Sequence, residues 1–430
     1  MTLNAQGTLS ASSDSLTTVL EINIPKTEVE PLFRQFVLEP FRREKAFLSN
    51  LDIKGSISAD LELRSRRGDF TVRSRCRWDE GSVDSADRAL SVQGIQLDLP
   101  LWLHGIGTGE KAGPVVKPKT RSSRRRGTAR EEAVRGSLRI RSAAFPLLPT
   151  QSFMFPLEAR PNQLSSPSST LMKVPGGEIK WGPFVLSDPL SPAFSLVTSL
   201  NMNAVQLDQI LTEAWGRPLQ GLARGSLDPI EISGDEISSK GKIEADLFGG
   251  TLSITNPGAY GIFSITPVVH LDAQWEELLL GELTEGTSFG KVEGVLEGHA
   301  RGIEIAGREP QKFDLLLETV QRDGVPQTIS TKAVDNISQI GGGQSALTGV
   351  FASFFKEFPY EKIGIRASLE NDLFRINGTI KEGGKEYIVK RGGFSGVNVV
   401  NQNPDNRISF KDMVKRVKRV TTSGGGAVVQ

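Results

Sequence analysis

The segment that decides the fold class is Lys242-Ile243-Glu244-Ala245-Asp246-Leu247. Apolar and charged side chains alternate along it at every second residue. Because successive side chains of a β-strand point to opposite faces of a sheet, this alternation predicts a strand with one apolar face and one solvated face. The triplet Phe248-Gly249-Gly250 follows directly and predicts a tight turn at the end of the strand.

The same alternation recurs on both sides of this segment. It runs through Ile53 to Leu63, Phe70 to Trp78, Ile303 to Ile305, Phe313 to Leu317, Ile363 to Leu369 and Phe374 to Ile380. Turn signals separate neighbouring strands at Asn256-Pro257-Gly258, Arg322-Asp323-Gly324 and Glu382-Gly383-Gly384. Many one-sided strands joined by short turns predict a mainly β protein built on an antiparallel sheet.

Three helix-like segments each precede a strand region. They are Thr27 to Leu48, Val205 to Trp215 and Ala273 to Leu283. A helix followed by strands, repeated with no shared centre, is typical of units stacked along one axis. The repetition therefore predicts an elongated, curved sheet with a few short amphipathic helices.

Composition divides the chain into five parts. They are an N-terminal β section over 1–108 with one helix at about 27–48, a basic flexible insertion over 109–132, a β and loop segment over 133–171, a C-terminal β section over 172–420 and a flexible tail over 421–430. The insertion contains Lys117-Pro-Lys-Thr-Arg-Ser-Ser-Arg-Arg-Arg126, and the third part ends in a Ser/Pro-rich linker, Asn162 to Thr170. Both stretches are typical of surface loops.

Charge and cysteine content narrow the function classes. The chain has 51 basic and 50 acidic residues, a formal charge of +1. Nucleic-acid binders need a net basic face, so we expect no nucleic-acid partner. Cys76 is the one cysteine, which excludes an intrachain disulfide and a Cys-based zinc site. We expect it to be a small buried hydrophobe in a strand over 69–78.

Two interpretations of the cellular location stay open. No run of about 18 apolar residues occurs, so no segment is predicted to span a bilayer. Residues Met1 to Leu20 lack the basic and apolar regions of a signal peptide. Either the protein is cytosolic, or this sequence starts inside a longer polypeptide.

No motif predicts a reaction, a metal or a cofactor. The histidines His104, His270 and His299 show no metal-ligand spacing, and each stands beside strand alternation, which favours a structural role. There is no GxSxG motif. The run Gly341-Gly-Gly-Gln-Ser345 lacks the Lys-Ser/Thr pair of a phosphate-binding P-loop. We therefore expect a protein that is not an enzyme; a carbohydrate-active enzyme on a β scaffold is the least favoured alternative.

Two further helices are predicted near the C-terminus. The first, Ser345 to Phe358, carries an apolar stripe that suits a core or the cap of an apolar trough. The second, Ser409 to Val420, begins at a capping serine. Its basic face is formed by Lys411, Lys415, Arg416, Lys418 and Arg419. A basic amphipathic helix can contact an anionic membrane or a partner, and the alternative is an ordinary docked helix with a solvated side.

Several C-terminal stretches resemble YdbH-like proteins of the AsmA-like superfamily. They are Gly290-Lys-Val-Glu-Gly-Val-Leu-Glu-Gly-His-Ala-Arg-Gly-Ile-Glu-Ile305, Ile329-Ser-Thr-Lys-Ala-Val-Asp-Asn-Ile-Ser-Gln-Ile-Gly-Gly-Gly343, Phe355-Lys-Glu-Phe-Pro-Tyr-Glu-Lys-Ile-Gly-Ile365, Leu373-Phe-Arg-Ile-Asn-Gly-Thr-Ile380 and Val397-Asn-Val-Val-Asn-Gln-Asn-Pro404. The likeness covers about residues 205–420. None of these motifs is catalytic, so the resemblance concerns fold and role.

The resemblance implies an apolar β-groove that carries phospholipid across the periplasm of a Gram-negative cell and supports outer-membrane lipid homeostasis. It implies a tether to the inner membrane through an N-terminal segment, which this sequence lacks. It also implies an outer-membrane lipoprotein or a membrane surface as partner near the C-terminus.

The physical chemistry of an uncovered sheet agrees with this implication. An apolar face left in water costs roughly 25 cal/mol per Å², and a bound acyl chain regains about 0.8 kcal/mol per buried CH₂. We predict that the apolar phase of the strands contacts lipid through Ile243, Ala245, Leu247, Leu315, Leu317, Ile363, Ile365, Phe374 and Ile376. A closed sandwich would also cover the face, and the alternative function is then a structural or adhesive envelope protein without lipid cargo.

Overall fold

The computed structural model of the protein describes residues 4–12, 15–41, 46–66, 69–85, 90–106, 132–145, 148–189, 191, 194–307, 309–340, 356–401, 408–411 and 414. These residues belong to two compact units. The first unit is Met1–Asn201 together with Pro229–Gly234, and the second is Met202–Asp228 together with Asp235–Gln430. The composition of the sequence predicts the boundary between the N-terminal and C-terminal sections near residue 172, thirty residues before the change of unit at Met202.

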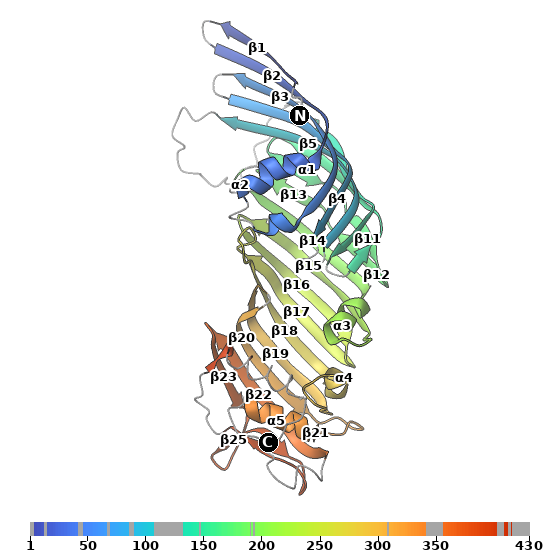
Figure 1. Ribbon diagram of the computed structural model, residues 1–430, viewed down its shortest axis with the longest axis vertical. Helices are drawn as coiled ribbons and strands as arrows, with labels where there is room; N and C mark the ends of the chain where they lie inside the picture. Colours follow the sequence, from blue (N-terminus) through green and yellow to red (C-terminus); the bar gives the residue numbers. More distant parts are fainter. Residues whose placement is uncertain are drawn as a thin grey trace, which may run out of the picture. The chain divides into compact units, whose positions relative to one another are not determined.

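The described chain is mainly β, with an open antiparallel sheet and few short helices, as the alternation predicts (Figure 1). No helix among the described residues is both long and apolar enough to cross a membrane.

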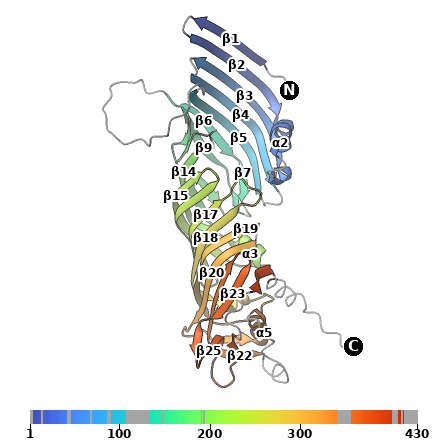
Figure 2. The ribbon, with the colours of Figure 1, turned by 90° about the vertical axis from the view of Figure 1, so that its left-hand side faces the viewer.

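The first unit begins with five strands that pair in chain order, β1 to β5, as Figures 1 and 2 show. They are β1 (Asn4–Ser12), β2 (Ser15–Glu28), β3 (Asp52–Arg66), β4 (Asp69–Ser85) and β5 (Leu90–Ile106). Four short helices separate β2 from β3: α1 (Val29–Phe33), η1 (Arg34–Leu38), α2 (Glu39–Phe41) and η2 (Ala46–Asn50). Of the helix predicted over 27–48, residues 29–41 are helical without a break, whereas Thr27 and Glu28 still belong to β2.

Shorter strands complete the first unit. They are β6 (Val134–Ile140), β7 (Ser142–Phe145), β8 (Leu148–Thr150), β9 (Phe153–Arg160), β10 (Gln163–Ser166), β11 (Thr170–Val174), β12 (Gly177–Trp181) and β13 (Phe184–Ser187). The sheet continues from β5 through β6, β9, β10 and β13. Two further strands, β14 (Ser195–Gln206) and β15 (Gly221–Ser233), contain residues of both units.

The second unit contains a series of antiparallel strands in chain order. They are β16 (Glu236–Leu247), β17 (Gly250–Tyr260), β18 (Val268–Leu279), β19 (Val295–Ala306), β20 (Glu309–Val320), β22 (Glu357–Glu370) and β23 (Leu373–Gly378). Its helices are α3 (Asp208–Trp215), α4 (Leu280–Thr284) and α5 (Thr331–Ile340). The remaining short strands are β21 (Thr328–Ser330), β24 (Ile380–Glu382), β25 (Lys385–Arg391), β26 (Val399–Val400) and β27 (Ile408–Ser409).

Four sequence predictions about elements are wrong. The segment 273–283 is mostly the end of β18, and only its last residues enter α4. Asn256-Pro257-Gly258 lies inside β17, where it shifts the pairing register instead of forming a hairpin turn. The linker 162–170 is paired, because β10 hydrogen-bonds to β9 and β13. Phe358, the last residue of the helix predicted over 345–358, lies in β22.

Other predicted turns and helices are confirmed, or they lie outside the residues that the structure describes. Turns occur at Gly249, Gly324 and Gly383, and α3 lies within the predicted segment 205–215. The basic insertion lies outside the described residues apart from Glu132, as do 345–355 of the predicted apolar helix. The tail 421–430 is outside as well.

Candidate functional site

The strand pairing of the second unit aligns apolar residues into two rows across seven strands. The first row is Ala245, Leu252, Trp275, Gly298, Leu317, Ile365 and Gly378. The second row is Ile243, Ile254, Ala273, Ala300, Leu315, Ala367 and Ile376. Residues paired directly across antiparallel strands share one face, so the two rows form a continuous surface. We call this surface the apolar face of the second unit.

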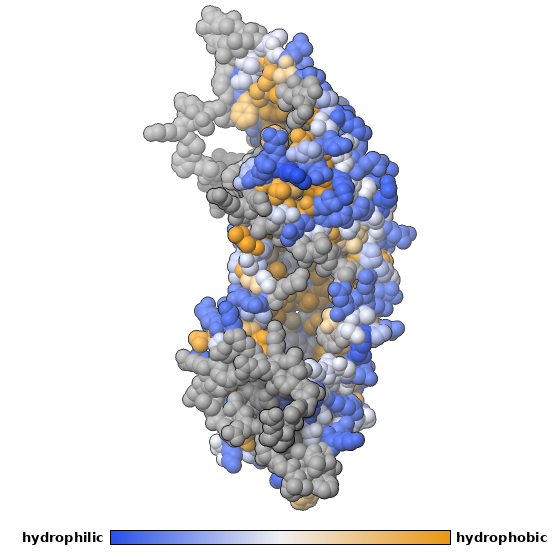
Figure 3. Space-filling model, in the orientation of Figure 1, coloured by the Kyte–Doolittle hydropathy of each residue, from blue (hydrophilic) through white to orange (hydrophobic). Residues whose placement is uncertain are grey.

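Part of this face is covered and part is open. Ala245, Leu247 and Ile376 are buried, whereas Leu315, Leu317 and Ile365 are only half-buried. The buried end is a cluster of Ala367, Leu369, Phe374 and Ile376, against which Phe410 packs. Figure 3 shows hydrophobic side chains along the hollow of the sheet in this unit. The apolar face therefore has a buried cluster at one end and, next to it, apolar side chains that the described residues cover only in part.

The opposite face of the same strands is polar. Glu244, His299 and Arg366 occupy the positions between the apolar rows. Lys242 lies 2.6 Å from the Glu244 carboxylate, and this hydrogen bond lowers the pKa of Glu244 below its ordinary value. Arg366 pairs with Asp314 at 3.0 Å. The charges thus interact with one another and with solvent on the side away from the apolar rows.

The first unit repeats the arrangement. Leu63 lies between Leu20 and Val72, and Leu103 continues the row in β5. The neighbouring row is Ile22, Leu61, Ser74 and Leu101. All of these side chains are half-buried. Figure 3 shows hydrophobic residues gathered beside the helical turns of this unit.

Cys76 belongs to this apolar face, between Ala59 and Leu99. It is half-buried in β4, and burial raises the pKa of its thiol. A raised pKa keeps the thiol protonated and unreactive at neutral pH. Cys76 thus lies in the strand that the alternation predicts, less fully buried than expected.

Six of the nine predicted lipid contacts belong to the two rows, and the other three, Leu247, Ile363 and Phe374, have the same phase in their strands but lie beyond the rows. Ile363 has different neighbours from the other predicted residues. It has the same phase as Ile365, but it is buried and pairs with Val389 of β25. The half-buried members are Ile243, Leu315, Leu317 and Ile365. Leu252, Ile254, Ala273 and Trp275 belong to the same face, yet the predicted set omitted them. Strand pairing identifies them, and the sequence alone does not give that pairing.

Of the basic residues predicted to contact a membrane or partner, only Lys411 is among the residues that the structure describes. Its side chain is exposed, and its backbone N–H donates to the Asp372 carboxylate at 3.1 Å. The Ser409 hydroxyl donates to the same carboxylate at 2.8 Å, which lowers the pKa of Asp372. Lys415, Arg416, Lys418 and Arg419 lie outside the described residues.

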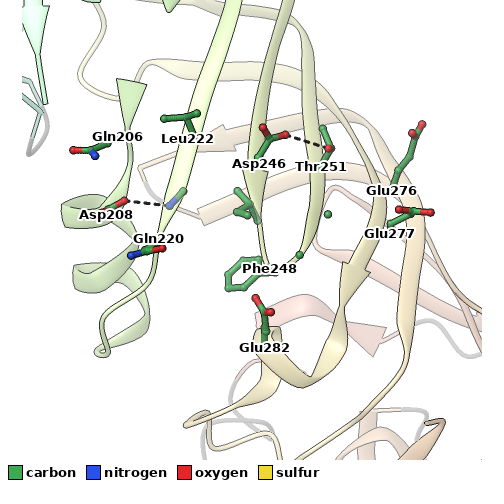
Figure 4. Close-up of a pocket in the computed structure, with 14 residues that line it drawn as sticks. Gln206, Asp208, Gln220, Leu222, Asp246, Phe248, Thr251, Glu276, Glu277 and Glu282 are labelled. Atoms are coloured by element: carbon green, nitrogen blue, oxygen red, sulfur yellow. Dashed lines mark hydrogen bonds between the residues drawn. The ribbon is translucent and has the colours of Figure 1, made fainter. Parts of the chain in front are cut away.

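An acidic hollow of about 770 Å³ lies at the turn between β16 and β17 (Figure 4). Its carboxylates come from α3, β16, β18 and α4: Asp208, Asp246, Glu276, Glu277 and Glu282. Two of them hold the backbone or other side chains, since Asp208 accepts from the Gly221 N–H at 3.2 Å and Asp246 binds Arg224 and Thr251. The negative charge makes this hollow a poor place for a phosphate group.

The histidines are not brought together. His104 lies 3.4 Å from the Thr71 hydroxyl, His270 stacks on Tyr260, and His299 lies on the polar face. No group of three or more His, Cys, Asp or Glu side chains within the described ranges is arranged to hold a metal ion. We therefore take the apolar face of the second unit as the candidate functional site.

Comparison with known proteins adds no relative: the chain matches no protein-family model, no curated protein and no solved structure. The resemblance to YdbH-like proteins stays a prediction that rests on the motifs quoted above.

Proposed function

We propose that this chain binds the acyl chains of phospholipids on its apolar sheet face and carries them between membranes. The observation that supports this role is the pair of rows across seven strands, in which Leu315, Leu317 and Ile365 are only half-buried. The proposed role is binding and transport, not catalysis.

The dimensions suit an acyl chain. Neighbouring strands lie about 4.8 Å apart, so six spacings between β16 and β23 span about 29 Å. One leaflet of a bilayer has a hydrocarbon thickness of about 15 Å, half of the whole core. The row is thus longer than one acyl chain, so an acyl chain can lie along part of it.

The cellular setting follows from the family resemblance and belongs to the same proposal. It is the periplasm of a Gram-negative cell, with a tether to the inner membrane and an outer-membrane lipoprotein or membrane surface near the C-terminus. A structural envelope protein without lipid is the alternative, and its apolar face would have to be covered by protein.

Two adjacent leucines of β20 provide a matched test. Leu317 lies on the apolar face between Gly298 and Ile365, whereas Leu316 lies on the polar face between His299 and Arg366. Leu317→Glu places a charge among acyl chains, and we expect it to reduce co-purified phospholipid at least tenfold. Leu316→Glu faces Arg366 and should leave lipid content within twofold. Lipid extraction followed by mass spectrometry measures both.

The outcome separates the two functions. Circular dichroism and thermal unfolding show whether both variants fold. A wild-type protein that purifies without lipid and takes up no fluorescent acyl probe supports the structural alternative. Equal lipid loss in two folded variants would show that the polar and apolar faces have been confused.

A further inference from the structure

Trp275 carries a polar atom that the apolar face does not satisfy. Its side chain lies in the first row, between Leu252 of β17 and Gly298 of β19. The residue is 9% exposed. Its indole Nε1–H is buried and has no hydrogen-bond partner among the described residues. Buried donors in proteins are nearly always satisfied, so an exception calls for an explanation.

The glycine beside it accounts for the position of the indole. A Cβ atom at residue 298 would lie 3.0 Å from the Trp275 Nε1 and would collide with the backbone of Leu316. Gly298 therefore leaves the space above β19 to the indole N–H. The donor lies in the middle of the row, with Leu317 as the next side chain along it.

A second tryptophan shows how this chain satisfies an indole when no ligand is needed. Trp78 lies on the apolar face of the first unit, between Ile57 and Leu97. Its Nε1–H donates to the backbone carbonyl of Lys54 at 3.1 Å, next to Gly55. Both tryptophans thus lie against a glycine of the adjoining strand, and of the two only Trp78 has an acceptor among the residues that the structure describes.

We propose that the Trp275 indole N–H donates a hydrogen bond to the acyl carbonyl oxygen of a lipid on the apolar face of the second unit. This inference rests on the proposed function. The other side chains of the row offer only hydrocarbon, so a single neutral donor selects a ligand with an alkyl chain and one strong acceptor. An ester, an amide or a protonated or ionised carboxyl group supplies that acceptor, because an indole nitrogen donates only.

The bond requires a small local movement. The nitrogen is covered in the structure, and Leu317 beside it is half-buried. Rotamer changes of incompletely packed side chains occur within nanoseconds, so a bound lipid can displace such a neighbour and reach the donor. The hydrogen bond then fixes the carbonyl at one place along a row that otherwise holds hydrocarbon without preference.

The test compares two lipids that differ only in the acceptor. Diester and diether phosphatidylcholine with identical chains are titrated into delipidated protein, and palmitic acid serves as a third probe. Because one hydrogen bond contributes modestly, we expect the wild type to bind the diester about 2- to 10-fold more tightly than the diether. Trp275→Phe should abolish this preference by weakening the diester alone, and Trp78→Phe should retain it.

Nuclear magnetic resonance gives a second readout, which is made on the wild-type protein. The chain has five tryptophans, so its ¹⁵N-labelled indole region holds five N–H signals, and Trp275→Phe or selective labelling assigns one to Trp275. That signal should move downfield with the diester and stay in place with the diether. A shift with palmitic acid but not the diester would support the same donor with a free fatty acid as its ligand.

Failure of the inference differs from failure of the proposed function. If the wild type binds diester and diether equally and the Trp275 signal does not move, Trp275 has no acyl acceptor although lipid binding stands. If neither lipid nor palmitic acid binds, the proposed function itself is wrong.

Discussion

At the scale of single residues, the polar face is held by paired charges. Arg75 of β4 and Asp98 of β5 are diagonal neighbours, since Asp98 is paired with Arg77, and they form a two-pronged ion pair with Arg75 Nε donating to Asp98 at 2.6 Å. The hydrogen bond from Arg75 lowers the pKa of Asp98, and the same contact raises the pKa of Arg75. Both side chains are partly solvated, so solvent screening limits the contribution of the pair.

We expect Asp98→Asn to lower the free energy of unfolding by up to about 1 kcal/mol at pH 7. A carboxyl whose pKa falls on folding stabilises the protein above its ordinary pKa of about 4, and this contribution is lost as pH falls through the folded value. The difference between wild type and variant should therefore shrink below about pH 4. Urea unfolding at several pH values measures it. A difference that persists unchanged at low pH would assign the effect to packing.

At the scale of elements, helix α5 packs its apolar side chains into the core near the C-terminal end of the second unit. Its residues Ala333, Val334 and Ile337 are buried, and so is Ile329 just before the helix. The side chain of Asn336 donates to the Phe289 carbonyl at 2.7 Å, which fixes the helix against the preceding loop. The periodicity of the sequence does not predict this helix, which spans Thr331–Ile340.

Ile337→Ala should destabilise the protein by about 2–5 kcal/mol, the usual range for such a truncation in a core. Lys332→Ala on the exposed side of α5 is the control and should change stability by less than about 0.5 kcal/mol. Chemical denaturation followed by circular dichroism gives both values. If Ile337→Ala unfolds at the wild-type denaturant concentration, α5 is not part of the cooperative core.

The elements also show what alternation can and cannot predict. Regular segments such as 242–247 of β16 and the whole of β23 follow from their period-2 pattern because each has one apolar and one solvated face. In β18 the pairing slips between Trp275 and Leu278, and Glu277 adopts a positive φ of 56°. This irregularity spaces apolar residues at 275, 278 and 279 as a helix would, and it makes the strand look helical.

Polar composition misled the prediction in the first unit for a related reason. Ser166 and Thr170 lie in the segment predicted as a loose linker, yet both are buried. The Thr170 hydroxyl donates to the Met154 carbonyl at 2.9 Å, and the Ser166 hydroxyl donates to the Ser168 carbonyl at 3.3 Å. Hydroxyl groups that find such acceptors tolerate burial. Composition alone does not reveal these contacts, because the Met154 acceptor lies sixteen residues before Thr170 and is brought near only by the fold.

At the scale of the whole molecule, the two units share one design, an antiparallel sheet with an apolar and a polar face. The sequence predicts the phase of each strand and thus the character of both faces. It does not predict which strands are neighbours, and so the continuous rows, the position of Gly298 beneath Trp275 and the burial of Ile363 appear only in the structure. The proposed lipid site depends on those rows more than on any single motif.

A protein that exchanges lipid with a membrane must also approach its surface, and the basic residues after Ser409 are the candidates in the sequence. Phe410 anchors the start of this segment, with its ring 5.9 Å from Phe374 and 6.3 Å from Phe313. Lys411 next to it is exposed. The segment therefore begins beside the buried cluster of Ala367, Leu369, Phe374 and Ile376 in the second unit.

Each Lys or Arg near an anionic membrane contributes about 1 kcal/mol, and salt screens this attraction. Replacing Lys415, Arg416, Lys418 and Arg419 by Gln removes four charges and keeps good helix formers. Unfolding should be unchanged, while binding to phosphatidylserine-containing liposomes at low salt should fall at least 100-fold and lose its salt dependence. Liposome sedimentation measures this. If the wild type does not sediment with these liposomes at low salt, the segment is a docked helix, and contact with the membrane belongs to another part of the chain.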